Sequence, residues 1–134
     1  MSQNSIRTAL STALAAITPA LATAWENVPF VPTADPYQIV NVLFGEPDNQ
    51  VLGVTEYWEI GFMQVRLMYP KDKGAFLAGA RAELTRSTLR RGASFVSGGI
   101  TVNISKTPTI SGGQIENDRF AIIVKVPFYA HITI

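Results

Sequence analysis

The chain contains no cysteine among its 134 residues. This absence excludes disulfide bonds, thiolate metal sites and a cysteine nucleophile. Charge is scarce as well: charged residues make up 16% of the chain, against about 25% in an ordinary soluble domain, while hydrophobic residues make up 47%. Eleven basic and ten acidic side chains leave a net charge of +1, so no overall field favours a nucleic acid, a membrane or an acidic substrate. Because so few side chains are charged, this composition predicts that part of the protein surface is apolar.

Common catalytic motifs are absent from the sequence. It has no phosphate-binding loop, nucleophile elbow or dinucleotide-binding glycine pattern. The only histidine, His131, has no evident catalytic partner, and the odd spacing of Glu56 and Glu59 places them on opposite faces of a strand. Loop carboxylates without histidine or cysteine neighbours are not expected to bind a metal. We therefore predict no catalytic, cofactor-binding or metal-binding residues, and no enzymatic activity.

The N-terminal segment predicts an amphipathic helix. It begins at Ser2 or Asn4, whose side chains can cap the first turn, and ends near Pro19. Its core-facing residues recur at helical spacing: Ile6, Leu10, Ala13, Leu14 and Ile17. The same Ala- and Leu-rich run imitates a signal peptide, but polar residues interrupt it, and no apolar stretch approaches the ~20 residues of a membrane span. A helix that covers a sheet is the favoured interpretation.

The middle of the chain predicts three strands. A weak strand over Leu21–Asn27 precedes a proline-rich linker, and Tyr37–Phe44 has the β-branched and aromatic content of a second strand. A turn-rich loop from Gly45 to Gly53 then joins this strand to a long third strand, Glu56–Pro70. We expect the second and third strands to pair in antiparallel fashion.

Both faces of the strand Glu56–Pro70 are apolar, which makes it the most informative segment of the chain. One face carries Tyr57, Glu59, Gly61, Met63, Val65, Leu67 and Tyr69. The other carries Trp58, Ile60, Phe62, Gln64, Arg66 and Met68. The helices of so short a chain can cover only one face, so the other is predicted to contact another subunit. We expect the Trp58 side to face the core and the Tyr57 and Met63 side to lie nearer the subunit contact.

The second half predicts one helix and two strands. A helix from Phe76 to about Arg90 would bury Phe76, Leu77, Ala80 and Leu84 and expose a basic face. A half-buried strand spans Ile100–Thr107, and a long loop covers Thr107–Arg119. The last strand has an apolar face formed by Phe120, Ile122, Val124, Val126 and Phe128. The glycine pairs at 98–99 and 112–113 indicate hairpin turns.

These elements predict a single α+β domain over residues 1–134. Its sheet is mainly antiparallel but mixed, and the N-terminal and central helices pack on one face. The arginines of the central helix, Arg81, Arg86, Arg90 and Arg91, are interpreted first as a solvated face. A nucleic-acid-binding module that uses these arginines stays open, although the segment lacks aromatic residues for base stacking.

A series of short segments resembles the tail terminator family of long-tailed bacteriophages. The segments follow an Ala-rich first helix and are Trp25-Glu26-Asn27, Pro29-Phe30, Pro36-Tyr37, Glu46-Pro47-Asp48-Asn49, Glu59-Ile60-Gly61, Gln64-Val65 with Leu67, Tyr69-Pro70, Arg91-Gly92, Thr107-Pro108 and Arg119-Phe120. The resemblance implies a structural virion protein that forms a hexameric ring on the tail tube, ends tube polymerisation and joins the head-side connector. It implies no cofactor, membrane or specific nucleic-acid binding, and a place at the head-proximal end of the tail after assembly in the host cytoplasm.

The predicted contact residues fall into two groups. Subunit contacts are assigned to Tyr57, Met63, Val65, Leu67, Arg81, Arg86 and Arg90. Contacts with the tube or connector are assigned to two loops, through Glu46, Asp48, Asn49, Gln114, Glu116 and Asp118. A neighbouring head-to-tail connector or tail completion protein is the first alternative function, and a small oligomeric enzyme with an oxygen-based site is the second.

Overall fold

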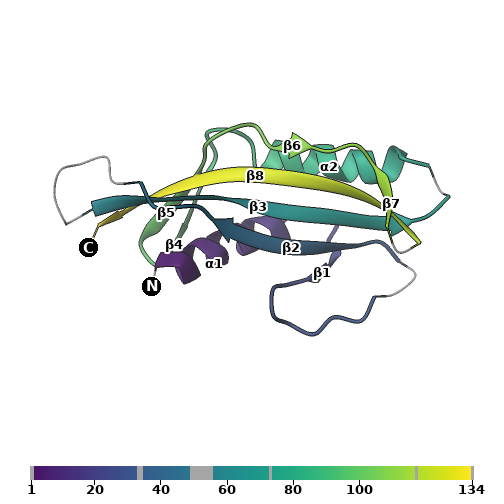
Figure 1. Ribbon diagram of the computed structural model, residues 1–134, viewed down its shortest axis with the longest axis horizontal. Coiled ribbons are helices and arrows are strands. Elements are labelled where there is room, and N and C mark those ends of the chain that lie inside the picture. Colours follow the sequence, from purple (N-terminus) through teal and green to yellow (C-terminus); the bar gives the residue numbers. More distant parts are fainter. Residues whose placement is uncertain (1, 33–34, 49–55, 73, 117, 134) are drawn as a thin grey trace.

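The computed structural model describes residues 2–32, 35–48, 56–72, 74–116 and 118–133. Its elements in chain order are α1 (Ser2–Ala15), β1 (Ala22–Ala24), β2 (Tyr37–Phe44), β3 (Glu56–Pro70), α2 (Phe76–Thr88), β4 (Ser94–Ser97), β5 (Ile100–Ile104), β6 (Thr109–Ile110), β7 (Gln114–Glu116) and β8 (Arg119–Thr133). Figure 1 shows the long strands β3 and β8 side by side along the longest axis of the molecule. The predicted bounds of β2 and β3 are confirmed.

The strands of the described residues form one curled sheet in the order β1-β2-β3-β8-β5-β4. β1 pairs with β2 in parallel, and the other pairs are antiparallel, so the predicted mixed, mainly antiparallel α+β fold is confirmed. β3 and β8 pair over their whole lengths, from Glu56 opposite Thr133 to Pro70 opposite Arg119. Along its other edge, β8 pairs with three short strands, β5, β6 and β7, at successive positions.

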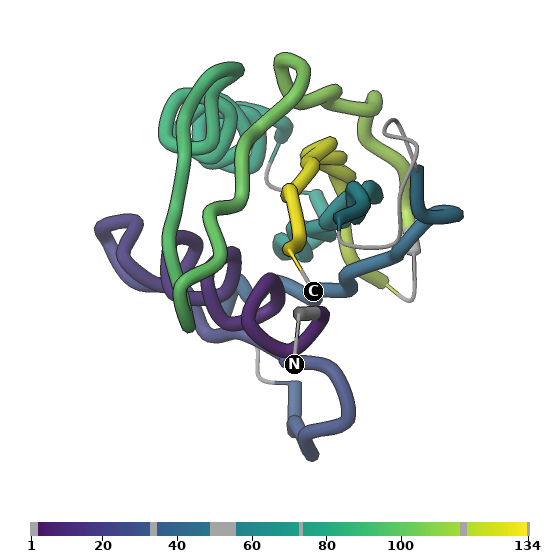
Figure 2. Tube along the Cα trace, turned by 90° about the vertical axis from the view of Figure 1, so that its left-hand side faces the viewer, coloured from purple at the N-terminus to yellow at the C-terminus, as the bar shows by residue number. Residues whose placement is uncertain are grey.

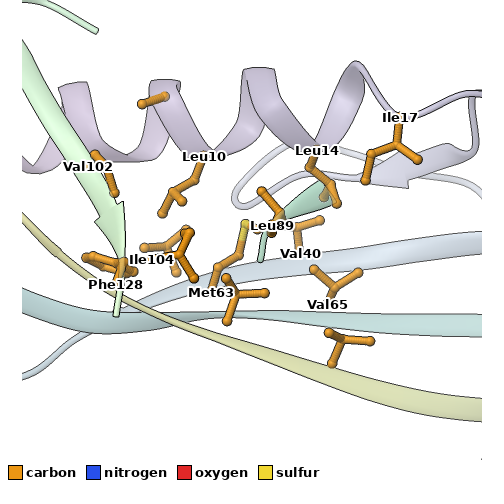
Figure 3. Packing of buried hydrophobic residues seen from close by; sticks show 14 of the residues in the cluster. Leu10, Leu14, Ile17, Val40, Met63, Val65, Leu89, Val102, Ile104 and Phe128 are labelled. Atoms are coloured by element: carbon orange, nitrogen blue, oxygen red, sulfur yellow. The ribbon is translucent and has the colours of Figure 1, made fainter. Parts of the chain in front are cut away.

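Both helices cover the same face of the sheet, as predicted. In Figure 2, which looks along the long strands, α1 and α2 lie with the β4–β5 hairpin on one side of β3 and β8. The apolar face of α1 is buried at Ile6, Leu10 and Leu14, and Ile17 is buried just after the helix ends. Figure 3 shows Leu10 and Leu14 pointing from this helix toward the sheet. The side chain of Ser2 and its place as a cap lie outside the described residues.

The assignment of the two faces of β3 was wrong. Met63, Val65 and Leu67 are fully buried in the core, whereas Ile60 and Phe62 on the other face are in part exposed. The register explains the difference, because the core residues of β3 lie opposite the most apolar face of β8. These pairs are Met63 with Val126, Val65 with Val124 and Leu67 with Ile122.

The predicted buried face of α2 was also wrong. The buried residues of the helix are Ala78, Arg81, Ala82 and Thr85. Small side chains let the helix axis approach β3 and β8 closely, so the larger residues point away from the sheet. Phe76 is 83% exposed and Leu77 is 62% exposed.

Three short strands were not predicted. β4 pairs with β5 as a hairpin whose turn at Gly98 and Gly99 has positive φ at both glycines, which confirms the turn predicted there. β6 and β7 lie inside the segment that was expected to be a loop, and both pair with β8. The glycines at 112–113 therefore interrupt a strand-like path along β8 and do not form a hairpin turn. That prediction was wrong.

Pro127 sits inside β8 at a position that tolerates its missing amide. The backbone N–H of Ser105 donates to the carbonyl of Pro127 at 3.1 Å. A strand residue directs its nitrogen and its carbonyl oxygen to the same side, so the ring nitrogen of Pro127 faces the gap where β5 has ended and β6 has not begun. Pro127 therefore removes no hydrogen bond from the sheet.

Candidate interaction surfaces

The face of the sheet opposite the helices carries an open apolar groove of about 680 Å³. Its apolar side chains come from β2, β3 and β8 and are called the outer groove below: Leu43, Trp58, Ile60, Phe62, Pro127 and Tyr129. Leu43 is 45% exposed and Ile60 is 38% exposed. Exposed large apolar side chains that gather on one face are typical of an interaction surface.

Strand register places these side chains in adjacent rows. Leu43, Phe62 and Pro127 form one row across the three strands, and Ile60 and Tyr129 are directly opposite each other in the next. These positions alternate with core positions along each strand, so all five project from the same side of the sheet. Side chains alternate between the two faces of each strand, so the alternation that directs one set of residues into the core directs the other set into the outer groove.

Aromatic rings give the outer groove one rigid end. The Trp58 ring lies 5.3 Å from the Tyr129 ring and 4.9 Å from the His131 ring, measured between centroids. The backbone beside Trp58 is held by Asp48, since each residue donates its N–H to the carbonyl of the other at 2.7 and 2.9 Å. Rings that are tilted against one another and held in this way lose little conformational entropy when a partner binds.

Charged groups lie at the margins of the outer groove and not on its floor. His131 Nε2 is 2.6 Å from Glu56 Oε2, beyond the Trp58 end. Lys125 Nζ lies 5.4 Å from the centroid of the Phe62 ring, and the exposed Lys106 borders the opposite wall. An apolar floor with charge only around it suits the apolar side chains of a protein partner better than a small polar substrate.

A second apolar surface lies on the other side of the molecule. The exposed face of α2 carries Phe76, Leu77, Ala80 and Leu84, which are called the α2 stripe below. A smaller cavity of about 270 Å³ separates this helix from Pro19 and Tyr69. The Arg81 guanidinium lines that cavity and donates from Nη1 to the carbonyl oxygen of Pro19. Arg81 therefore joins the chain after α1 to α2.

Burial changes the ionisation of the pair that lines this cavity. It raises the pKa of the Tyr69 hydroxyl above its ordinary value near 10, and the Arg81 guanidinium opposes that rise. Burial also lowers the pKa of Arg81, and Tyr69 opposes that change. The two groups form a local polar junction beneath the α2 stripe.

We expect Tyr69→Phe to reduce the loss of stability at alkaline pH. The folded-state pKa of Tyr69 is raised, so its contribution to stability is complete below the unfolded-state value near 10 and is lost as pH rises through the folded-state value. Urea unfolding of both proteins at pH 7 and at several values above about pH 10 measures this difference. Arg81 is present in both proteins. The prediction would be contradicted if the free energy of unfolding fell by the same amount with rising pH in Tyr69→Phe and in the wild type.

The residues predicted to form the subunit contact do not come together on one surface. Met63, Val65 and Leu67 are in the core of the single subunit, and Arg81 is buried. Burial leaves these four residues no surface for a partner, so their assignment to a subunit contact is corrected. Tyr57 is half-buried against the core, Arg86 donates from Nε to the Pro108 carbonyl at 3.1 Å, and Arg90 is exposed.

The two predicted contact loops lie at opposite ends of the long sheet. Asp48 bridges to Trp58 near the start of β3, with Glu46 exposed beside it. Gln114 on β7 and the exposed Asp118 lie where β8 begins, beside the end of β3. Asn49 and the side chain of Glu116 lie outside the described residues. One loop at each end is compatible with two different axial partners.

Sequence reasoning missed the outer groove as a unit. It had placed Trp58 and Phe62 in the core and had not assigned Leu43, Pro127 or Tyr129 to any site. The available signal was a second, weaker apolar alternation in β8, at Pro127 and Tyr129, which matches the outer face of β3 once the strands are paired.

The part of the chain that the structure describes holds neither a candidate metal site nor a membrane-spanning helix. No group of three or more His, Asp or Glu side chains in these ranges could hold a metal ion. Among the described helices, none has the length and apolar character needed to cross a membrane.

Comparison with known proteins identifies the family. A family model described as phage tail terminator protein matches residues 5–128. One solved structure is similar over 97% of this chain and 96% of its own, with a TM-score of 0.78 and 23% sequence identity, which supports the fold. A comparison with functionally curated proteins gives no match. The match over almost the whole chain shows that the protein belongs to the phage tail terminator family, a family of structural proteins of the phage tail and not of enzymes.

Proposed function

We propose that this protein forms a closed ring, a hexamer, on the end of the completed tail tube. There it stops the addition of further tube subunits and offers the surface to which the head-side connector binds. Its partners are copies of itself, the tube protein and the connector, without membrane or specific nucleic-acid binding. The ring would assemble in the host cytoplasm and stay at the head-proximal end of the tail.

The observation that carries the proposal is the pair of unpartnered apolar surfaces on one small domain. The outer groove and the α2 stripe lie on opposite sides of the sheet, because α2 packs on the core face. A subunit with two different complementary surfaces can form head-to-tail contacts, and such contacts make a ring when the rotation closes. A closed ring has no free lateral surface, which is the property that a cap on a polymer needs.

Tube growth in the presence of the protein tests this function. We expect tube subunits of the same phage to stop elongating when the purified protein is added during polymerisation. Negative-stain images should then show short tubes with extra density at one end, and the bound species should have six times the 14.6 kDa subunit mass. Added to finished tubes, the protein should bind one end without changing their length.

Two outcomes would contradict the proposed function. Tubes that keep growing while carrying the protein at one end would favour a neighbouring connector or tail completion protein, which binds the tail without ending its polymerisation. A protein that ignores tubes at every concentration would exclude a terminal position. Heat-denatured protein at equal mass is the control for crowding effects on tube growth.

A further inference from the structure

The geometry points to a specific contact between neighbouring copies: the α2 stripe of one subunit docks into the outer groove of the next. This inference rests on the proposed ring and names the surfaces that build it. Each surface is apolar and exposed within its own subunit, since Phe76 and Leu77 protrude on one side and Leu43 and Ile60 border the groove on the other. The occupant to which we commit is a second copy of this chain.

The two surfaces have matching dimensions. The α2 stripe runs from Phe76 to Leu84, and eight steps of 1.5 Å make it about 12 Å long. The floor of the outer groove runs along β3 from Trp58 to Phe62, and four steps of about 3.4 Å make it roughly 14 Å long. Three adjacent strands at about 4.8 Å spacing give a floor roughly 10 Å wide, close to the diameter of a helix. A single helix therefore fits the groove.

The shapes favour contact between unlike surfaces. Phe76 and Leu77 are adjacent at the start of α2 and expose most of their side chains on the convex surface of a helix, whereas the outer groove is concave. Two convex stripes facing each other would touch along a line, and two grooves would leave a water-filled space between them. A ridge in a groove excludes water from both, as when an amphipathic helix docks in an apolar groove.

Charge at the margins is complementary as well. Glu83 flanks the α2 stripe with a side chain that is 65% exposed, and its nearest cation, Arg86 Nη1, is 3.8 Å away. The wall of the outer groove next to Pro127 carries the exposed Lys106, and the exposed Asp48 lies at the other side of the groove beside Trp58. A docked helix would place an acid near a base at the rim, where exposed pairs contribute little affinity but favour one orientation.

Two complementary defective variants test the contact. Leu77→Glu damages only the α2 stripe, and Ile60→Glu damages only the outer groove. We expect each variant alone to lose the ring, with subunit affinity reduced by about tenfold or more. Mixed in equal amounts, they retain one intact stripe and one intact groove, so they should form a 1:1 dimer and nothing larger. Sedimentation velocity in solution and analysis of the material bound to tubes measure the masses.

Folding controls keep this test decisive. Both altered residues are exposed, so circular dichroism and the melting temperature should match those of the wild type. Leu43→Lys replaces Ile60→Glu as the groove variant if the latter is unstable, because Leu43 borders the same groove and is more exposed. Val96→Glu, on β4 and outside both surfaces, is the matched control and should assemble normally.

The cysteine-free chain allows a direct test of proximity. A subunit with Leu77→Cys and a subunit with Ile60→Cys should be joined by a short bismaleimide only when both are present. A Val96→Cys subunit should join neither. Self-coupling of Ile60→Cys alone would overturn the inference in favour of a symmetric contact between two grooves.

The remaining outcomes separate this inference from the proposed function. If the wild type forms rings and caps tubes but Leu77→Cys and Ile60→Cys are not joined in solution or on tubes, the contact is wrong and the function stands. If groove variants keep the ring but lose capping, the groove binds the tube protein and the contact is again wrong. If the wild type neither forms rings nor binds tubes, the function fails.

Discussion

Gly61→Val should abolish the stable fold. Gly61 lies opposite Phe44 on β2 and Phe128 on β8, and a Cβ at this position would collide with the carbonyl oxygen of Leu43 and lie 3.0 Å from the Cα of Phe44. Both contacts are with backbone, which cannot move aside as the tip of a side chain can. We expect a loss of about 4 kcal/mol or more, a large part of the stability of a small domain.

The aromatic pair over Gly61 adds to the cost. The rings of Phe44 and Phe128 come from the two strands that flank β3 and meet edge to face, with centroids 5.8 Å apart at 80°. They can meet because the residue between them has no side chain. Valine would both separate β2 from β3 and displace this pair, so the core beneath the outer groove would lose its packing.

Urea titration followed by tryptophan fluorescence measures this effect, since Trp58 lies on β3 near the change. Gly79→Ala is the matched control: a Cβ on Gly79 meets nothing within 4 Å, and alanine is favoured over glycine inside a helix by up to about 1 kcal/mol. Cooperative unfolding of Gly61→Val at the urea midpoint of the wild type would contradict the prediction.

Leu10→Ala should lower the free energy of unfolding by about 3 kcal/mol. Leu10 is fully buried, and Figure 3 shows it between α1 and the residues Ile104 and Met63 of the sheet. Alanine has the best helix propensity, so the helix itself loses nothing and the effect reports packing alone. The melting temperature should fall by roughly 10 °C.

Thermal unfolding monitored by circular dichroism tests the Leu10 prediction. Gln3→Ala, at an exposed position of the same helix, is the control and should leave the melting temperature within a few degrees. A drop for Gln3→Ala as large as that for Leu10→Ala would mean that helix formation limits stability, and packing on the sheet would not be the main contribution of α1.

Local signals predicted some elements well. In β2, β-branched and aromatic residues run from Tyr37 to Phe44 and turn residues follow at once, so both ends of the strand were clear. In α1, three large apolar residues at helical spacing, Ile6, Leu10 and Leu14, left one face to bury. In each of these two segments the sequence pattern was consistent with only one kind of secondary structure and one buried face.

The faces of β3 could not be assigned because both are apolar. Trp58 and Phe62 are larger than Met63 and Val65, and size favoured the wrong side. The pairing register of β3 with β8 determines which face of β3 is buried, because it aligns Met63 with Val126. This register depends on two strands that are far apart in the sequence, so it cannot be read from β3 alone. The candidate site was missed for the same reason, since the outer groove exists only after that register is set.

The error in α2 has a different physical origin. The helix has two stripes at helical spacing, one large and apolar and one of small residues with Arg81. Hydrophobicity favours burial of Phe76 and Leu77, but close packing on the sheet selects Ala78 and Ala82. The short strands β6 and β7 were missed because pairing with β8, and not their own composition, makes them strands.

The position of β8 sets the order in which the protein can fold during synthesis. β3, β5, β6 and β7 all hydrogen-bond to β8, which follows every one of them in the chain. Until the ribosome has released this strand, β3 has a partner on one edge only, and its core residues lack the side chains of β8 that pack beside them. Sheet closure then depends on contacts between distant parts of the chain, which is typical of slow folding. Newly made chains are therefore most prone to aggregate just before β8 emerges, and the outer groove, which includes Pro127 and Tyr129 of β8, exists only in completed chains.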